Sequence, residues 1–159
     1  MRALKLIQLM KTKAPDLSAE LVRRIRASDK CKELSLRVPE SEQEQHGLEI
    51  LQDLTDWLSN ETDATIEARY VALGIRRAGQ KVPVCELCWA ITIARECLWD
   101  YTQHECLLEE PVEFWGGVVM LRSLNSFFDR ALYFAALGYA KAESDEAATL
   151  SFLAQKRSA

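Results

Sequence analysis

The chain has 159 residues, of which 48% are hydrophobic and 28% are charged, and its formal net charge is −4. This length and composition are typical of one soluble globular domain that buries a sizeable core. The acidic balance gives no indication of nucleic-acid binding. The longest apolar runs, at 114–121 and 131–140, are shorter than the roughly 20 residues that cross a bilayer.

The N-terminal segment does not resemble a secretory signal, because Lys5 and Gln8 interrupt its apolar stretch. Five cysteines, an odd number, argue against a disulfide framework in a chain that can bury a large core. We therefore expect a cytoplasmic protein with reduced thiols and no membrane association. We predict one domain over 1–159, with a core at about 16–142 and with peripheral helices or frayed tails at 1–14 and 143–159.

Helical periodicity dominates the chain and predicts an all-α fold, an antiparallel bundle of about five main helices. The first helix is expected to begin at Pro15, and the polar segment 38–45 is expected to be a loop before the second. Several capping side chains at 59–63 predict a break between the second and third helices. The third helix is expected to end at Gly79, a residue suited to the left-handed conformation.

The fourth helix is expected to begin at Pro83, and its inward positions are Val84, Leu87, Ile91, Leu98 and Tyr101. The fifth is expected at 111–142, and it is apolar around most of its circumference. A helix of this kind must be enclosed, either at the centre of the bundle or against a second chain. Because few other helices are available to surround it, we favour a homodimer formed through the fifth or the fourth helix.

Two segments carry a family resemblance. The first, 76–101, contains Arg76-Arg77, Gly79, a Val82-Pro83 turn, Glu86-Leu87 and Leu98-Trp99-Asp100, and the second is FFDRALYFAALGYAKA at 127–142. Both resemble the N-terminal domain of RsbT co-antagonist (RsbRD-type) proteins, the sensor halves of stressosome-like regulators. The resemblance extends over about 44–142. It implies an all-helical bundle that senses a signal or contacts a partner protein, usually ahead of an output domain.

Because the sequence after Ala142 is too short for an output domain, we expect a stand-alone sensor or protein-interaction domain in bacterial stress signalling. Such a domain would act through a separate signalling partner protein. The sequence contains no glycine-rich phosphate loop, no G-x-S-x-G and no H-E-x-x-H. We therefore predict a non-enzymatic function without a cofactor.

Arg95 stands in the middle of the apolar stripe of the fourth helix. A buried, unpaired guanidinium is very costly, so Arg95 should contact a carboxylate or an anionic ligand. Asn125 and Asp129, on or beside the apolar face of the fifth helix, are candidate partners, and Arg76 flanks the inner face of the third. These four residues predict a ligand-binding polar pocket inside the bundle. The alternative is an internal ion pair, or an arginine that extends past the edge of the core.

Cys85 and Cys88 form a C-x-x-C in the first turn of the fourth helix, where the helix dipole favours a thiolate. They support an alternative function, a thiol-redox or metal-binding protein. A structural zinc site needs four ligands, and the remaining candidates lie too far along the same helix: Cys97, His104 and Cys106. We therefore predict no metal site and favour two small core residues. His46 and His104 are expected to be solvated or at helix ends.

Overall fold

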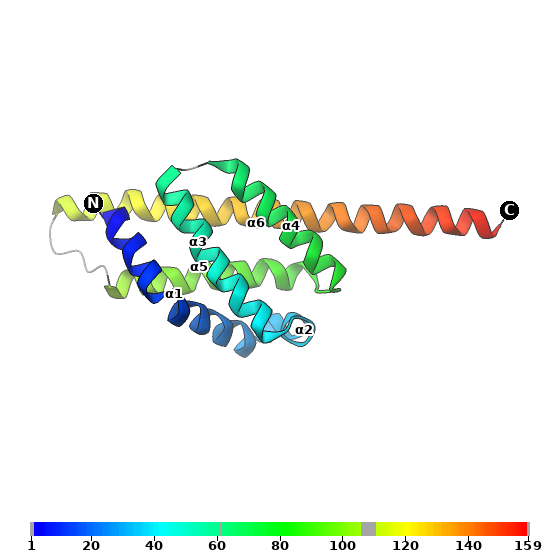
Figure 1. The fold of residues 1–159 in the computed structure, drawn as a ribbon, viewed down its shortest axis with the longest axis horizontal. Helices are drawn as coiled ribbons and strands as arrows, with labels where there is room; N and C mark the ends of the chain where they lie inside the picture. Colours follow the sequence, from blue (N-terminus) through cyan, green and yellow to red (C-terminus); the bar gives the residue numbers. More distant parts are fainter. Residues whose placement is uncertain (1, 61, 106–110, 159) are drawn as a thin grey trace.

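The computed structural model describes the backbone of residues 2–60, 62–105 and 111–158 and the side chains of 4–60, 62–104 and 118–158. These residues form helices and no strand, so the predicted all-α fold is confirmed. The elements are α1 (Arg2–Ala27), the 3₁₀ turn η1 (Asp29–Cys31), α2 (Lys32–Arg37), α3 (Glu40–Asn60), α4 (Asp63–Gly79), α5 (Val84–Glu105) and α6 (Pro111–Arg157). Five of the helices are long and α2 is short. Figure 1 shows α6 running along one side of the bundle, where α4 and α5 pack against it.

A single hydrophobic core joins the long helices and extends from Leu6 on α1 to Tyr139 on α6. Leu6 and Met10 are 0% and 1% exposed, so the core includes part of the N-terminal segment that was expected to be peripheral. The predicted helix start at Pro15 is wrong, because α1 is continuous from Arg2 to Ala27 and contains Pro15 in its interior. Proline lacks the N–H that an internal helix position donates, and α1 bends in this region (Figure 1).

The contact between α4 and α6 brings two helix backbones unusually close. A Cβ atom on Gly74 would lie 2.0 Å from the carbonyl oxygen of Ala135, and one on Gly138 would lie 2.1 Å from that of Val71. Glycine at both positions removes the side chains that normally separate packed helices. The two helices therefore contact each other backbone to backbone, and a shift of one must displace the other.

Helix α6 is much longer than the predicted helix at 111–142, because it continues without a break to Arg157. At 1.5 Å per residue, its 47 residues span about 70 Å. Figure 1 shows its C-terminal part extending well beyond the other helices, and the residues from 143 to 158 are exposed. Among the described residues, no helix is both long and apolar enough to cross a membrane.

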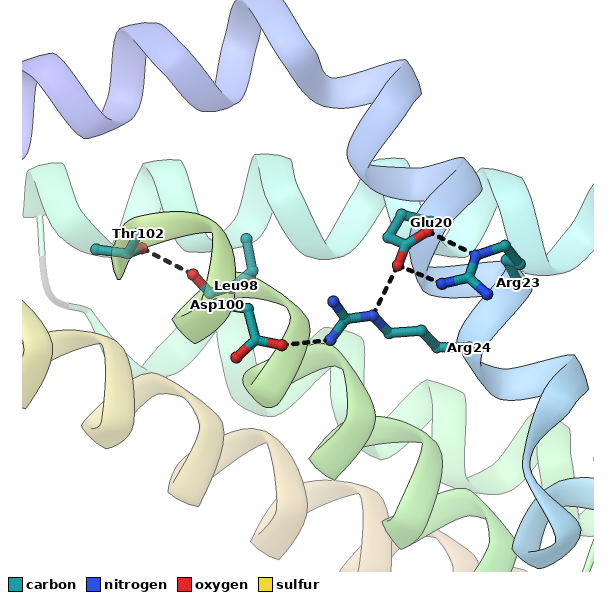
Figure 2. A network of polar contacts seen from close by, with 6 residues as sticks. All are labelled: Glu20, Arg23, Arg24, Leu98, Asp100 and Thr102. Carbon is teal, nitrogen blue, oxygen red and sulfur yellow. Dashed lines mark hydrogen bonds and ion pairs between the residues drawn. The ribbon is translucent and has the colours of Figure 1, made fainter. Parts of the chain in front are cut away.

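An ion-pair network connects α1 to α5. Figure 2 shows Arg24 between Glu20 of its own helix and Asp100 of α5, with nitrogen–oxygen distances of 2.9 and 2.7 Å. Arg23 contacts the same glutamate, and the two guanidinium groups lower the pKa of Glu20 to about 2. Two residues after Asp100 on the same helix, the Thr102 hydroxyl donates a hydrogen bond to the carbonyl of Leu98. This network fixes the register of α1 against α5.

The turn between α4 and α5 differs from the prediction in its details. The left-handed residue is Lys81, with φ 61°, and Gly79 does not adopt a positive φ. Pro83 directly precedes α5, and its carbonyl accepts hydrogen bonds from the N–H groups of Glu86 and Leu87. The Tyr139 hydroxyl donates to the carbonyl of Val82 at 2.8 Å and so anchors this turn on α6.

Two further expectations can be compared with the helix boundaries. The segment 38–45 was expected to be a loop, but α3 begins at Glu40, so most of it is helical. The break predicted at 59–63 is confirmed, because α3 ends at Asn60 and α4 begins at Asp63. Of the positions predicted to face inward on α5, Val84 is 40% exposed, which makes that prediction wrong, whereas Leu87, Ile91 and Leu98 are buried.

Candidate functional site

Two of the four predicted site residues, Asn125 and Asp129, line an open groove between α5 and α6, and Arg95 contacts the second of them. The Arg95 guanidinium lies 3.4 Å from a carboxylate oxygen of Asp129, and the indole N–H of Trp99 donates to the side-chain oxygen of Asn125 at 3.0 Å. Trp99, Asn125 and Asp129, together with Arg122, line a hollow of about 570 Å³. The Asp129 side chain is 70% exposed. The groove is therefore a surface feature, and the expectation of an internal pocket at these residues is wrong.

The fourth predicted residue, Arg76, lies on α4, away from this groove. Its guanidinium is 3.7 Å from Glu42 of α3. Glu42 has stronger contacts with two other side chains, because Arg77 lies 2.6 Å away and the Gln80 amide donates to both carboxylate oxygens. The structure therefore separates the four predicted residues into two places.

The C-x-x-C lies at the start of α5 but does not form part of the core. Cys85 is exposed and Cys88 is half-buried, so the prediction of two small core residues is wrong for Cys85. Burial and the neighbouring Cys85 raise the pKa of Cys88. A raised pKa disfavours the thiolate that redox chemistry requires. The buried cysteines of the described residues are Cys31 and Cys97, and burial raises the pKa of Cys31 to about 11.

The structure gives no support to a metal site. Among the described residues, no three His, Cys, Asp or Glu side chains are close enough to hold a metal ion. His104 is exposed near the end of α5, as predicted. Cys106, considered above as a zinc ligand, lies outside the described residues.

A second hollow, of about 260 Å³, lies between α3 and α4, which we call the α3–α4 cleft. Its lining combines three residues of one stripe on α3 with residues of α4: His46, Glu49, Asp53, Arg69, Tyr70, Ala72, Leu73 and Arg76. Arg69 lies 2.8 Å from Asp53 at one end, and Arg76 and Arg77 contact Glu42 at the other. The two helices are therefore bridged by arginine–carboxylate pairs at both ends of the cleft.

Burial controls the charge of two side chains in the cleft. Asp53 is 6% exposed, and its burial raises its pKa to about 6 in spite of the nearby Arg69. Burial, together with Arg77 and Arg76, lowers the pKa of His46 to about 4. His46 is therefore neutral at pH 7, and its ring can both donate and accept a hydrogen bond. This histidine was expected to be solvated or at a helix end, but it is half-buried in the second turn of α3.

Sequence reasoning named Arg76 as a site residue, but as part of a pocket with Arg95, and it did not name Asp53, Tyr70 or His46 as site residues. The spacing contained a signal, because His46, Glu49 and Asp53 follow each other by three and four residues and share one face of a helix. Arg69 and Arg76, seven residues apart, also share a face. What the sequence lacked was the register that places these two faces opposite each other.

The fold and its two polar hollows define an all-helical module that is suited to binding and to protein contacts, with one helix extending beyond the bundle. The family model described as the RsbT co-antagonist protein rsbRD N-terminal domain matches residues 15–151, so the chain belongs to this family. The resemblance found from the sequence is thereby confirmed, and the chain is a signalling domain of the stressosome type. No match was found among curated proteins or among solved structures.

Proposed function

We propose that this protein is a non-enzymatic cytoplasmic sensor that signals through protein contacts and forms a homodimer through α6. The family supports the signalling role. The observation that carries the proposal is the extension of α6, which is continuous from the bundle to Arg157. Its C-terminal part exposes Leu150, Phe152 and Leu153, at 60%, 56% and 50%.

Exposed apolar side chains that cluster on one element are typical of protein-contact surfaces. Leu150 and Leu153 are three residues apart and therefore share one face of α6. A second copy of the chain that packs on this face would cover both leucines. The α5–α6 groove, lined in part by Asn125 and Asp129, is open at the surface and suits a contact with a partner protein.

The helix packing supports a route for the signal. Because α4 and α6 contact each other at Gly74 and Gly138, a displacement of α4 requires α6 to move with it. A continuous helix passes such a movement along its length, as in the small helix shifts of known switches. The sensing event would occur in the bundle, and the dimer or partner would respond at the extension of α6.

Size-exclusion chromatography with light scattering tests the dimer. The wild-type chain is expected to have the mass of a dimer, and the double variant Leu150→Glu/Leu153→Glu the mass of a monomer, because two buried carboxylates would disfavour the interface. Leu36→Glu is the matched control, because Leu36 is 80% exposed on α2, and it should remain dimeric. A monomeric wild-type chain, or a dimer that persists in the double variant, would contradict the proposal.

A further inference from the structure

The α3–α4 cleft contains a buried hydroxyl group without a protein partner of standard geometry. Tyr70 is 2% exposed, and its hydroxyl interacts with the buried Asp53 carboxylate without reaching standard hydrogen-bond geometry. The Oδ1 atom of Asp53 also forms an ion pair with Arg69. Buried polar groups in native proteins are nearly always satisfied, by protein, by ordered water or by a ligand. Both groups line the cleft, so a molecule within it can supply the missing contacts.

Two guanidinium groups of the cleft have donors to spare. Arg69 contacts Asp53 through one of its nitrogens and is 47% exposed. Arg76 is 62% exposed and 3.7 Å from a glutamate that Arg77 and Gln80 already engage. A guanidinium group has five N–H donors in a planar fork that matches a carboxylate. The free donors of Arg76 therefore favour a carboxylate at its end of the cleft, and those of Arg69 lie at the Asp53 end.

The rest of the lining constrains the other end of the ligand. Glu49 and Asp53 are acceptors when ionised, and neutral His46 is both donor and acceptor. Leu73 and Ala72 add an apolar wall. A ligand that carries a carboxylate and a donor group on a short carbon skeleton can contact the arginine donors, the carboxylate acceptors and the apolar wall together. The volume of about 260 Å³ lies below the usual range of drug-sized pockets and suits a small metabolite.

We propose that the α3–α4 cleft binds a small amino or hydroxy acid, with its carboxylate on Arg76 at one end and its amino or hydroxyl group on the Glu49 and Asp53 side. The binding itself is independent of the oligomeric state, whereas its role as the sensed signal rests on the proposed sensor function. Because Arg69, Tyr70 and Arg76 belong to α4, an occupied cleft would act on the helix that contacts α6.

Isothermal titration calorimetry and thermal unfolding of the whole chain test the site, with L-alanine, L-glutamate and L-lactate as probes. At least one probe is expected to bind and to raise the unfolding temperature. L-Alaninamide, which lacks the carboxylate, and acetate, which lacks the donor group, should bind at least about tenfold more weakly, as expected for the loss of a charge-assisted hydrogen bond.

Arg76→Gln tests the assigned contact, because Arg76 is exposed and its replacement should leave the fold intact by circular dichroism. We expect this variant to lose at least about tenfold in affinity, and Tyr70→Phe to weaken binding as well. Arg23→Gln, on the exposed side of α1, is the matched control and should bind as the wild type does. If no probe binds at about 20 mM, roughly twenty times the upper end of typical metabolite affinities of about 1 mM, water fills the cleft and the proposal is wrong. Binding that Arg76→Gln leaves unchanged would overturn it equally, and in either case the dimer test remains separate.

Discussion

Asp53 is the side chain whose chemistry depends most on its position in the fold. It is 6% exposed and lies beside Tyr70 and 2.8 Å from Arg69. A buried carboxylate loses its hydration, and a single partly exposed arginine does not replace it. The net result is a pKa raised from 3.8 to about 6, with Glu49 and Asp56 contributing in the same direction.

The variant Asp53→Asn is expected to change the pH dependence of stability. The folded protein holds the Asp53 proton more tightly than the unfolded chain, so ionisation opposes folding. The free energy of unfolding should therefore fall as the pH rises from below 3.8 to above about 6. A tenfold change in proton affinity corresponds to about 1.4 kcal/mol, so the full loss is roughly 3 kcal/mol.

Urea unfolding of both proteins at pH 4 and pH 8 measures this effect. The stability of Asp53→Asn relative to the wild type should rise by roughly 2.5 kcal/mol between these values, because asparagine cannot ionise and part of the loss has already occurred at pH 4. Asp56→Asn, on the exposed side of the same helix, is the matched control and should change stability by less than about 0.5 kcal/mol at pH 8. Parallel pH profiles for the wild type and Asp53→Asn would show that Asp53 is not a strained carboxyl.

For single residues, the sequence predicted a position correctly where the periodicity of one helix was sufficient to determine it. The periodicity of α5 placed Arg95 in the middle of its apolar stripe, and that of α6 placed Asp129 on or beside its apolar face as a candidate partner, and the contact between them is present. The burial of Asp53 depends instead on the register of α3 against α4, which neither helix specifies alone. Cys85, on the first turn of α5, was assigned to the core although it is exposed, because the pattern of α5 alone does not show which part of the helix its neighbours cover.

Among the elements, α4 and α6 form the contact that most limits movement in the bundle. At Gly74 and Gly138, a Cβ atom would lie within 2.0 and 2.1 Å of backbone oxygens, which cannot move as a side chain can. The T-shaped contact of Tyr70 with Phe127, with ring centroids 5.9 Å apart, extends the same interface. Tyr70, which lines the α3–α4 cleft, therefore packs directly against α6.

Gly74→Ala and Gly138→Ala are each expected to destabilise the fold. Alanine favours a helix over glycine by about 1 kcal/mol, but here its methyl group must force two backbones apart. Overpacking of this kind costs about 1–3 kcal/mol or more, so we expect a net loss of about 1–2 kcal/mol for each variant in urea unfolding.

Gly79→Ala is the control for these variants, because a Cβ atom on Gly79 meets nothing within 4 Å. It should be neutral or slightly stabilising, by up to about 1 kcal/mol. If Gly74→Ala and Gly138→Ala behave as Gly79→Ala does, the α4–α6 contact is looser than the structure indicates.

Helix ends were predictable where capping residues or prolines mark them. The break predicted at 59–63 lies where α3 ends, although the Thr62 side chain makes no capping hydrogen bond, and the turn at 80–83 precedes α5. The acidic segment at 143–146 was interpreted as the start of a tail, but the chain contains no glycine or proline after Gly138. Without such a residue nothing in the local chemistry stops a helix, and α6 continues to Arg157.

The whole molecule consists of a packed bundle and an extension of α6, and these two parts differ in what stabilises them. The bundle has a shared core, whereas the residues from 143 to 158 are exposed. An isolated helix of about 15 residues is only marginally stable in water. In a monomer the extension should therefore fray, and in a dimer it should be stabilised by the partner's extension.

Hydrogen exchange at several protein concentrations distinguishes these two states. Amides at 145–156 should gain protection as the concentration rises, because protection there requires a second chain. Amides near Gly74 and Gly138, which lie in the α4–α6 contact, should be protected at every concentration. In Leu150→Glu/Leu153→Glu the extension should exchange rapidly throughout. Protection at 145–156 that is independent of concentration, and is kept in the double variant, would mean that the extension is stable alone and that α6 does not hold the dimer together.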